Sequence, residues 1–412
     1  MVKKSKNQIT VVDVGSKTVK SIIAEFDEDG MFNIIGIGKS NSELGMRKGN
    51  IVSISNAVEA IRDSVESAMN MATTSVEEVI VSISGDHIKT FNSKASVLIN
   101  GNVINSSDID RVLQKSKDSF ISQKKEVIHI IPQVFFVDDQ KVKDPVNMTG
   151  STLEASVHVA LANETNAINL RNCLNEIDLR IKCFVFSPIA SSYGVLSETE
   201  RDINTIIIDI GHGTSTAVAY FDGNIEFSTI LPVGGFNITN DLAVTLNIDN
   251  KTAEEIKLKY GFSLFDEDDE DRVIELDNYE NISESMVSKI IGARVFEIFS
   301  YLKDDLEKSE IYKEKAYGKI PLTIVLTGGT ARLKNIDVLA KEVFGEKVKI
   351  KISYPKYNIR GLVDLVKAPE YATTVGLLHF AKEYCGFSLK DGKLSGNSNI
   401  LGKFFEAIKK RF

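Results

Sequence analysis

Two segments of this chain repeat the same pattern of apolar and polar positions. Each is a run of β-branched residues that ends in an aspartate, followed by a glycine-containing turn and a second apolar run. Residues 11–19 read VVDVGSKTV and residues 207–215 read IIDIGHGTS, so that Asp13 falls on Asp209. Short β-branched runs bounded by glycine are typical of buried strands. The repeat therefore predicts two strand–turn–strand units, in two halves of similar fold that face each other.

The positions around each unit predict a similar order of strands and helices in both halves. In the first half, apolar runs predict strands at residues 9–14, 19–26 and 32–40, helical spacing predicts a helix at 56–72, and a further strand is predicted at 78–84. In the second half, they predict strands at 205–210, 215–220, 224–231 and 322–326 and helices at 236–246, 252–260 and 283–307. Helices at 188–196 and 369–382 are expected to cross between the halves, and Gly376 indicates close packing there.

Residues 87–163 interrupt the order of the first half. Strands are predicted at 89–99, 127–137 and 157–161, around a helix at 107–120. We expect a separate small subdomain inserted into the first half. The alternative is that these strands merely extend the sheet of the first half.

The turns that follow the two aspartates have the composition of an anion site. Gly211 and Gly213 let the backbone come close to a phosphate, and exposed N–H groups can surround it. The carboxylate at the end of each strand can hold a divalent cation, usually through water. A plain hairpin accounts for either turn alone. Because two such hairpins can grip a polyphosphate from both sides, the duplication predicts nucleotide binding.

Two more glycine pairs follow in the second half. Residues 232–235 (PVGG) precede a predicted helix, where backbone N–H groups can lie near an anion. Residues 327–330 (TGGT) follow a buried strand, and such a turn lets a flat adenosine or a phosphate approach the backbone. Glu255 and Lys259 are four residues apart in a predicted helix, and this spacing alone predicts an exposed ion pair.

Composition and charge exclude several classes of protein. The 412 residues are 43% hydrophobic and 26% charged, which is ordinary for a soluble globular protein with two large domains. The net charge of −8 argues against a nucleic-acid binder. The three cysteines are scattered, without the spacing of a metal site or a disulfide framework, and this fits a reducing cytoplasm. The basic start lacks the apolar stretch of a signal peptide, and no apolar run is long enough to cross a bilayer, so any membrane contact is expected to be peripheral.

The last residues combine a linker with an amphipathic pattern. Residues 386–398 are rich in Gly, Ser, Asn and Lys, which is typical of a flexible linker. In a helix over residues 399–412, one face is apolar and cations surround it: Leu401, Phe404, Phe405, Ile408 and Phe412, with Lys403, Lys409, Lys410 and Arg411. Such a helix is suited to lie in a membrane interface, with its lysines at anionic headgroups. The alternative is a helix docked on the protein's own body or on a partner.

Taken together, the motifs resemble those of a known family. DVGSKT, DIGHGT, PVGG and TGGT occur in this order in the superfamily of actin, Hsp70 and sugar kinases. Six longer stretches are more closely similar to the FtsA family of bacterial actin-like cell division proteins: SISGDHI, VIHIIPQVFFVD, SPIASSYGVL, AEEIKLKYG, IVLTGGTARL and YATTVGLLHFAK. The resemblance covers nearly the whole chain, including the amphipathic end.

This resemblance implies an α/β fold with two actin-like lobes, built from duplicated RNase H-like domains. It also implies the inserted subdomain of the FtsA type and a C-terminal amphipathic helix. The implied parts are subdomain 1A (1–86 and 164–202), subdomain 1C (87–163), subdomain 2A (203–233 and 304–385), subdomain 2B (234–303), the linker (386–398) and the membrane-targeting helix (399–412).

ATP and Mg²⁺ are implied in the cleft between the lobes. The implied phosphate contacts are Gly15, Ser16 and Lys17 from the first lobe and Gly211, His212, Gly213 and Thr214 from the second. Gly234 and Gly235 would line the cleft, Glu255 and Lys259 would approach the ribose or adenine, Gly328, Gly329 and Thr330 would pack on the adenosine, and Asp13 and Asp209 would face the Mg²⁺.

One position departs from the family pattern, which often reads Gly-Gly-Gly-Thr at the second phosphate turn. His212 stands in the middle of that turn here. If the residue contributes its backbone N–H, the side chain is tolerated. If the site needs a closer approach, His212 lowers the nucleotide affinity.

The family's role is to tether filaments of the tubulin-like protein FtsZ to the inner face of the cytoplasmic membrane at midcell. Its members also polymerise and signal to later division proteins, and the implied FtsZ contact lies around residues 235–303. Hydrolysis in the family is weak or hard to detect, and the sequence shows no obvious general base. Two alternatives remain: a sugar or acid kinase of the same superfamily, and a pilus-assembly relative with the same insertion, against which the amphipathic tail argues.

Overall fold

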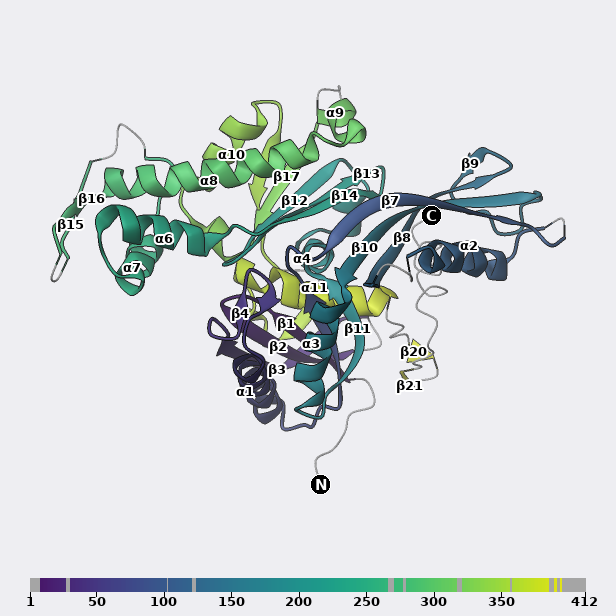
Figure 1. Cartoon of the computed structure of the whole chain (residues 1–412), viewed down its shortest axis with the longest axis horizontal. Helices are drawn as coiled ribbons and strands as arrows, with labels where there is room; N and C mark the ends of the chain where they lie inside the picture. The colour runs from purple at the N-terminus through teal and green to yellow at the C-terminus, as the bar shows by residue number, and fades with distance from the viewer. Residues whose placement is uncertain are drawn as a thin grey trace.

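The computed structural model describes residues 8–26, 30–101, 103–120, 124–265, 270–276, 279–316, 321–355, 358–384, 389–390 and 393–394. Figure 1 shows a first lobe around β1, β2 and β3, a second lobe around β12, β13 and β17, and a strand-rich part that projects beside them. Of the predicted linker at 386–398 only residues 389–390 and 393–394 are described, and the predicted amphipathic helix at 399–412 lies wholly outside the described residues.

The sheets of the two lobes have the same topology around the repeated strands. The first runs β11–β6–β1–β2–β3–β19 and the second runs β18–β17–β12–β13–β14. In each, the repeated strand pairs antiparallel with the next strand and parallel with one that comes later in the chain. The duplication predicted from the sequence is therefore confirmed. Asp13 and Asp209 stand at equivalent places, opposite Lys20 and Thr216 of the neighbouring strands.

The strands of the first-lobe sheet are β1 (Gln8–Val14), β2 (Thr18–Phe26), β3 (Phe32–Asn41), β6 (Glu78–Ile83), β11 (Arg180–Phe186) and β19 (Ile359–Gly361). Those of the second-lobe sheet are β12 (Thr205–Ile210), β13 (Ser215–Phe221), β14 (Asn224–Leu231), β17 (Thr323–Thr327) and β18 (Lys349–Ile352). Short hairpins are formed by β4 (Met46–Arg47) with β5 (Asn50–Ile51), by β15 (Val273–Ile274) with β16 (Ile282–Ser283), and by β20 (Leu389–Lys390) with β21 (Lys393–Leu394).

Helices cover these sheets because each has one apolar face. On α1 (Ile54–Ala72), Val58, Ile61, Val65 and Ala68 are buried at helical spacing. The helix begins two residues before the predicted start, with Ser53 as its N-cap. The other helices are α3 (Glu164–Asn175), α5 (Glu198–Arg201), α6 (Gly235–Leu246), α7 (Asn250–Tyr260), α8 (Glu284–Leu306), α9 (Glu310–Ala316) and α10 (Ile336–Phe344), with 3₁₀ turns at Gly329–Arg332, Val363–Leu365 and Pro369–Tyr371.

The inserted segment forms a sheet of its own, in the order β7–β10–β8–β9, and does not extend the sheet of the first lobe. The elements are β7 (Lys89–Leu98), α2 (Ser106–Asp118), β8 (Lys125–Val137), β9 (Gln140–Val142) and β10 (Thr152–Asn163). Ile109, Val112 and Leu113 of α2 pack on this sheet in a separate apolar cluster. The inserted sheet also contacts the second lobe, where Thr90 Oγ1 donates to the carbonyl oxygen of Ser228 in β14 at 2.5 Å.

Two helices cross at the junction of the lobes, as predicted: α4 (Ser187–Val195) and α11 (Ala372–Tyr384). Figure 1 shows them side by side between the two sheets. Their backbones approach closely because glycine faces backbone on both sides. A Cβ at Gly376 would overlap the carbonyl oxygen of Ala190, and one at Gly194 would overlap that of Ala372.

Among the described residues, no helix is long and apolar enough to span a membrane.

Adding one methyl group at this crossing tests its role. We expect Gly376→Ala to lower the free energy of unfolding by about 1–3 kcal/mol, because the new Cβ overlaps a backbone atom that cannot turn away. This is the opposite of the usual gain for Gly→Ala within a helix. Denaturant unfolding measures the difference, with Glu66→Ala on the exposed face of α1 as the control. Unchanged or higher stability of Gly376→Ala would contradict this account of the crossing.

Candidate functional site

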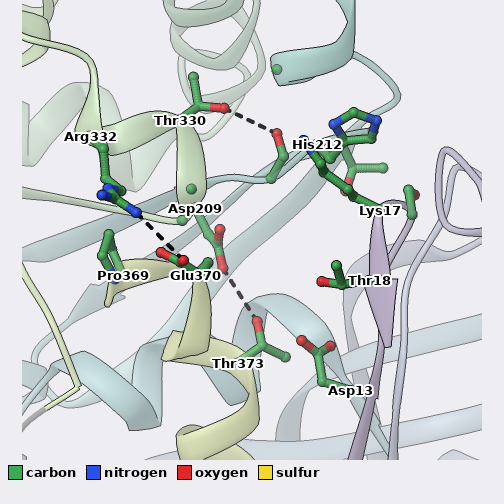
Figure 2. A pocket seen from close by; sticks show the side chains of 18 of the residues that line it. Asp13, Lys17, Thr18, Asp209, His212, Thr330, Arg332, Pro369, Glu370 and Thr373 are labelled. Carbon is green, nitrogen blue, oxygen red and sulfur yellow. Dashed lines mark hydrogen bonds and ion pairs between the residues drawn. The ribbon is translucent and has the colours of Figure 1, made fainter. Parts of the chain in front are cut away.

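A cleft of about 630 Å³ lies between the lobes, where the ends of the repeated strands meet. Figure 2 shows Asp13 entering it from the first lobe and Asp209 from the second, with Lys17, His212 and Thr330 around them. Of the residues predicted to bind nucleotide or metal, these line the cleft: Asp13, Gly15, Ser16, Lys17, Asp209, Gly211, His212, Gly213, Thr214, Gly235, Lys259, Gly328, Gly329 and Thr330.

The two predicted phosphate turns, at residues 15–18 and 211–214, are closed by the same kind of hydrogen bond. Gly15 N donates to Thr18 O at 3.2 Å in the first turn, and Gly211 N donates to Thr214 O at 2.9 Å in the second. The turns also touch each other, since a Cβ at Gly213 would lie 2.7 Å from Ser16 Oγ. Glycine at position 213 therefore allows the two turns to approach each other closely.

Asp13 is held by a network of hydrogen bonds within the first lobe and from α11. Its carboxylate accepts from Ser82 Oγ at 2.9 Å and from Thr374 Oγ1 at 3.3 Å, and Lys20 Nζ lies 3.4 Å away. Lys20 also lines the cleft. Lys20 is not among the residues predicted from the sequence, although its register opposite Asp13 in the hairpin could have indicated it.

Asp209 carries the strongest electrostatic conflict in the cleft. Burial, together with the nearby charge of Asp13, raises the pKa of Asp209 to about 6. The hydroxyl of Thr373 donates to Asp209 at 3.4 Å, and this bond and the charge of Lys20 lower the pKa only in part. A carboxylate in this position is stabilised by a cation, because a positive charge offsets both the burial and the repulsion.

A second charged cluster joins the lobes beside the phosphate turns. Lys17 Nζ lies 2.6 Å from Glu254 Oε1 across the cleft, and Lys257 Nζ lies 2.6 Å from Glu254 Oε2. Burial by itself would raise the pKa of Glu254, but the charge of Lys257 and hydrogen bonds from Lys17, Lys257 and Thr239 hold it at about 2. Lys257 also donates to Gly235 O at 2.9 Å, which ties the cluster to the start of α6.

The far end of the cleft is bounded by the turn after β17. Gly328 has a φ of +87°, and a Cβ there would lie 2.6 Å from the carbonyl oxygen of Ile210, so the turn requires glycine. Thr330 Oγ1 donates to Gly211 O at 3.3 Å, which links this turn to the second phosphate turn. At the rim of the cleft, Arg332 Nη1 lies 3.6 Å from Glu370 Oε1 (Figure 2). The segment that follows β17 is a 3₁₀ turn over Gly329–Arg332.

Two predicted residues do not line the cleft. Glu255 is exposed on α7, and its neighbour Glu254 faces the cleft instead, because Glu254 and Lys257 share a helical face that Glu255 does not. Gly234 packs against the second phosphate turn, where a Cβ would lie 2.7 Å from Gly211 O and 2.8 Å from His212 O. Gly234 therefore shapes that turn from behind.

Replacing one of the paired carboxylates tests the electrostatic conflict. Because folding raises the pKa of Asp209 from 3.8 to about 6, its charge destabilises the folded protein above pH 6. Without ligand at pH 8, we expect Asp209→Asn to raise the free energy of unfolding by about 2 kcal/mol. The gain should shrink as the pH falls from 6 towards 4, where both states of the wild type become protonated. Denaturant titrations across this range measure it, with the exposed Asp63→Asn as control; a gain that grows on acidification would contradict the assignment.

Comparison with solved structures identifies the fold. The structure is similar to the PilM-PilN type IV pilus biogenesis complex (TM-score 0.66, 15% identity, covering 90% of this chain and 98% of that one). It is also similar to MreB5 of Spiroplasma citri bound to ADP, with a TM-score of 0.56 and 14% identity, covering 91% of this chain and 96% of that one. The TM-score to the MamK double helical filament is 0.52, with 14% identity, covering 91% of this chain and 99% of that one. These similarities show an actin-like fold.

Sequence comparison gives the family. The family model "Cell division protein FtsA" matches residues 206–376, and the model "SHS2 domain inserted in FTSA" matches residues 85–161. The chain is 31% identical over 402 residues to the cell division protein FtsA of Pseudomonas aeruginosa, covering 96% of this chain and 94% of that protein. It is 32% identical over 379 residues to that of Neisseria meningitidis, covering 90% of each. The chain therefore belongs to the FtsA family of cell division proteins.

Proposed function

We propose that the cleft binds ATP with Mg²⁺. The observation that carries this proposal is the pair Asp13 and Asp209, which meet across the cleft between two glycine turns that touch each other. The donor set fits the ligand: backbone N–H groups for phosphate oxygens and carboxylates for a hard cation. Among the described residues no group of three or more His, Cys, Asp or Glu side chains could hold a metal alone, which suits a cation bound largely through phosphates and water.

Each part of the lining has a proposed role. The turns at residues 15–18 and 211–214 would hold the phosphates, with Lys17 adding charge. Glu254 and Lys257 would approach the ribose, in place of the Glu255 named from the sequence, with Lys259 beside them. Gly328, Gly329 and Thr330 would pack on the adenosine. Bound Mg²⁺ would offset the charge of the phosphates and of both aspartates.

We propose that hydrolysis is weak or absent. The carboxylates of the described lining are Asp13, Asp209, Glu254 and Glu370. The two aspartates are assigned to the cation. Glu254 is engaged by Lys17 and Lys257, and Glu370 faces Arg332. A general base must be free to accept a proton from the attacking water, and the partners of Glu254 oppose that role.

We further propose that the protein tethers FtsZ filaments to the cytoplasmic face of the cell membrane at midcell, polymerises, and helps to recruit later division proteins. Membership of the FtsA family supports this role, and the similarity to a filament of MamK supports self-association. The amphipathic sequence at 399–412 supports peripheral attachment to anionic lipid. The proposed FtsZ contact lies around residues 235–303, where Val244, Met286 and Phe296 expose apolar side chains.

ATP binding is tested by exchanging one lysine of the cleft. Lys257→Met removes a buried cation from the lining and leaves Glu254 without that partner. We expect ATP to bind at least about tenfold more weakly, because a charged hydrogen-bonding group is lost from the site. Titration with a fluorescent ATP analogue and Mg²⁺ measures the affinity. Lys251→Met, exposed at the start of the same helix, serves as control and should bind like the wild type. Equal affinity of both variants would contradict the proposed site.

Membrane tethering is tested by sedimentation with liposomes that contain anionic lipid. We expect the full chain to sediment with the liposomes and to carry FtsZ with it in the presence of ATP and Mg²⁺. A chain ending at Ser398, and the double variant Phe404→Glu with Ile408→Glu, should stay in solution, because the apolar face is absent or charged. Full liposome binding by both would contradict the tether. ATP binding by the truncated chain and by the double variant would show that their lobes are folded.

A further inference from the structure

The last residue of β3 and the loop that follows it, at residues 41–45, are fastened to the first phosphate turn. Ser42 Oγ donates to Gly15 O at 2.7 Å, and Ser42 N donates to Lys17 O at 3.0 Å. The loop is further closed by hydrogen bonds from Gly45 N and Met46 N to Ser42 O. Its backbone therefore moves with the first lobe.

The next residue of the same loop reaches the second phosphate turn. Glu43 Oε1 lies 3.3 Å from Nε2 of His212, which belongs to the second lobe. Asn41 orients Glu43, because Glu43 N donates to Asn41 Oδ1 at 2.8 Å and Asn41 Nδ2 donates to Glu43 Oε2 at 3.3 Å. Neighbouring residues of one loop thus bind the phosphate turns of both lobes.

His212 is held in place for this contact. Its ring packs against Phe236 at 5.4 Å between centroids, and its carbonyl oxygen accepts from Phe236 N at 2.8 Å. Burial, with the charges of Lys17 and Lys257, lowers the pKa of His212 to about 4. The imidazole is therefore neutral at pH 7, and its Nε2 makes a polar contact at 3.3 Å with the Glu43 carboxyl group.

A second contact, between Lys17 and Glu254, also crosses the cleft. Lys17 lies on the phosphate turn, so phosphate oxygens of a bound nucleotide compete with Glu254 for its ammonium group. The imidazole Nε2 of His212 is turned towards Glu43 instead. The backbone N–H of His212 stays available to the ligand, while its side chain joins the lobes. The histidine that departs from the glycine pattern therefore has a contact of its own.

We propose that residues 41–45 form a clip that joins both phosphate turns and slows the entry and exit of a nucleoside triphosphate, with Glu43 as a positioning residue that acts through His212. This inference rests on the proposed nucleotide site. A contact made only between protein groups resists opening of the cleft by the same amount before and after binding. Its loss should therefore speed association and dissociation alike and leave the equilibrium affinity nearly unchanged.

Stopped-flow kinetics with a fluorescent ATP analogue and Mg²⁺ test the clip in the full-length chain. For Glu43→Ala we expect both rate constants to rise about fivefold, as for the loss of one partly exposed charged contact. His212→Phe keeps an aromatic ring against Phe236 but removes the nitrogen that contacts Glu43, so both rate constants should rise as in Glu43→Ala. The double variant should be no faster than either single variant, because both remove the same contact.

Further variants separate the clip from general damage to the fold. Glu43→Gln keeps an acceptor oxygen and should stay closer to the wild type than Glu43→Ala. Glu59→Ala, exposed on α1, should match the wild type in both rate constants. Unchanged rates in Glu43→Ala would overturn the clip. So would faster dissociation with unchanged association, since that pattern indicates direct ligand contact. Failure of the wild type to bind the analogue would instead contradict the nucleotide site itself.

Discussion

The repulsion between two partly desolvated carboxylates is the constraint on which the site depends. Asp13 and Asp209 end equivalent strands of two sheets, and the packing of the lobes brings them into one cleft. Neither burial nor a like charge favours the ionised form of Asp209, whose pKa rises to about 6. A protein keeps such an arrangement at a cost in stability when a bound cation is needed. The same charge conflict that weakens the folded chain would be relieved by the cation that we propose to bind there.

The positions of Asp13 and Asp209 relative to each other depend on backbone packing at the crossing of α4 and α11. Helices α4 and α11 cross with glycine facing backbone on each side, so the two sheets share a narrow junction. Thr373 and Thr374, at the start of α11, reach Asp209 and Asp13 respectively. One helix therefore sets the relation of the lobes and also holds both carboxylates, which couples the angle between the lobes to the charges in the cleft.

The inserted domain is attached to the second lobe through the strand that leads to the site. His158 Nε2 lies 2.7 Å from Ser228 Oγ, and Gln133 Nε2 donates to Ile225 O at 2.8 Å. Ser228 and Ile225 both belong to β14, which ends just before the turn that packs on the second phosphate turn. A domain inserted into the first lobe is thus bound to the second lobe through one buried and one half-buried side chain, and this gives the family's inserted domain a physical connection to the cleft.

The sequence by itself determined the duplicated strands, the two glycine turns and the crossing helices, together with fourteen of the residues that line the cleft. These follow from local rules, since β-branched runs, glycine pairs and helical spacing act within a few residues of each other. Tertiary structure alone decided which helical face of α7 meets the cleft, and so replaced Glu255 with Glu254. It also brought Lys20 and Thr373 into the cleft, placed Gly234 behind the turn, and set Glu43 against His212. Those contacts join residues far apart in the chain, and their distances depend on how the lobes pack, which no pattern of neighbouring residues records.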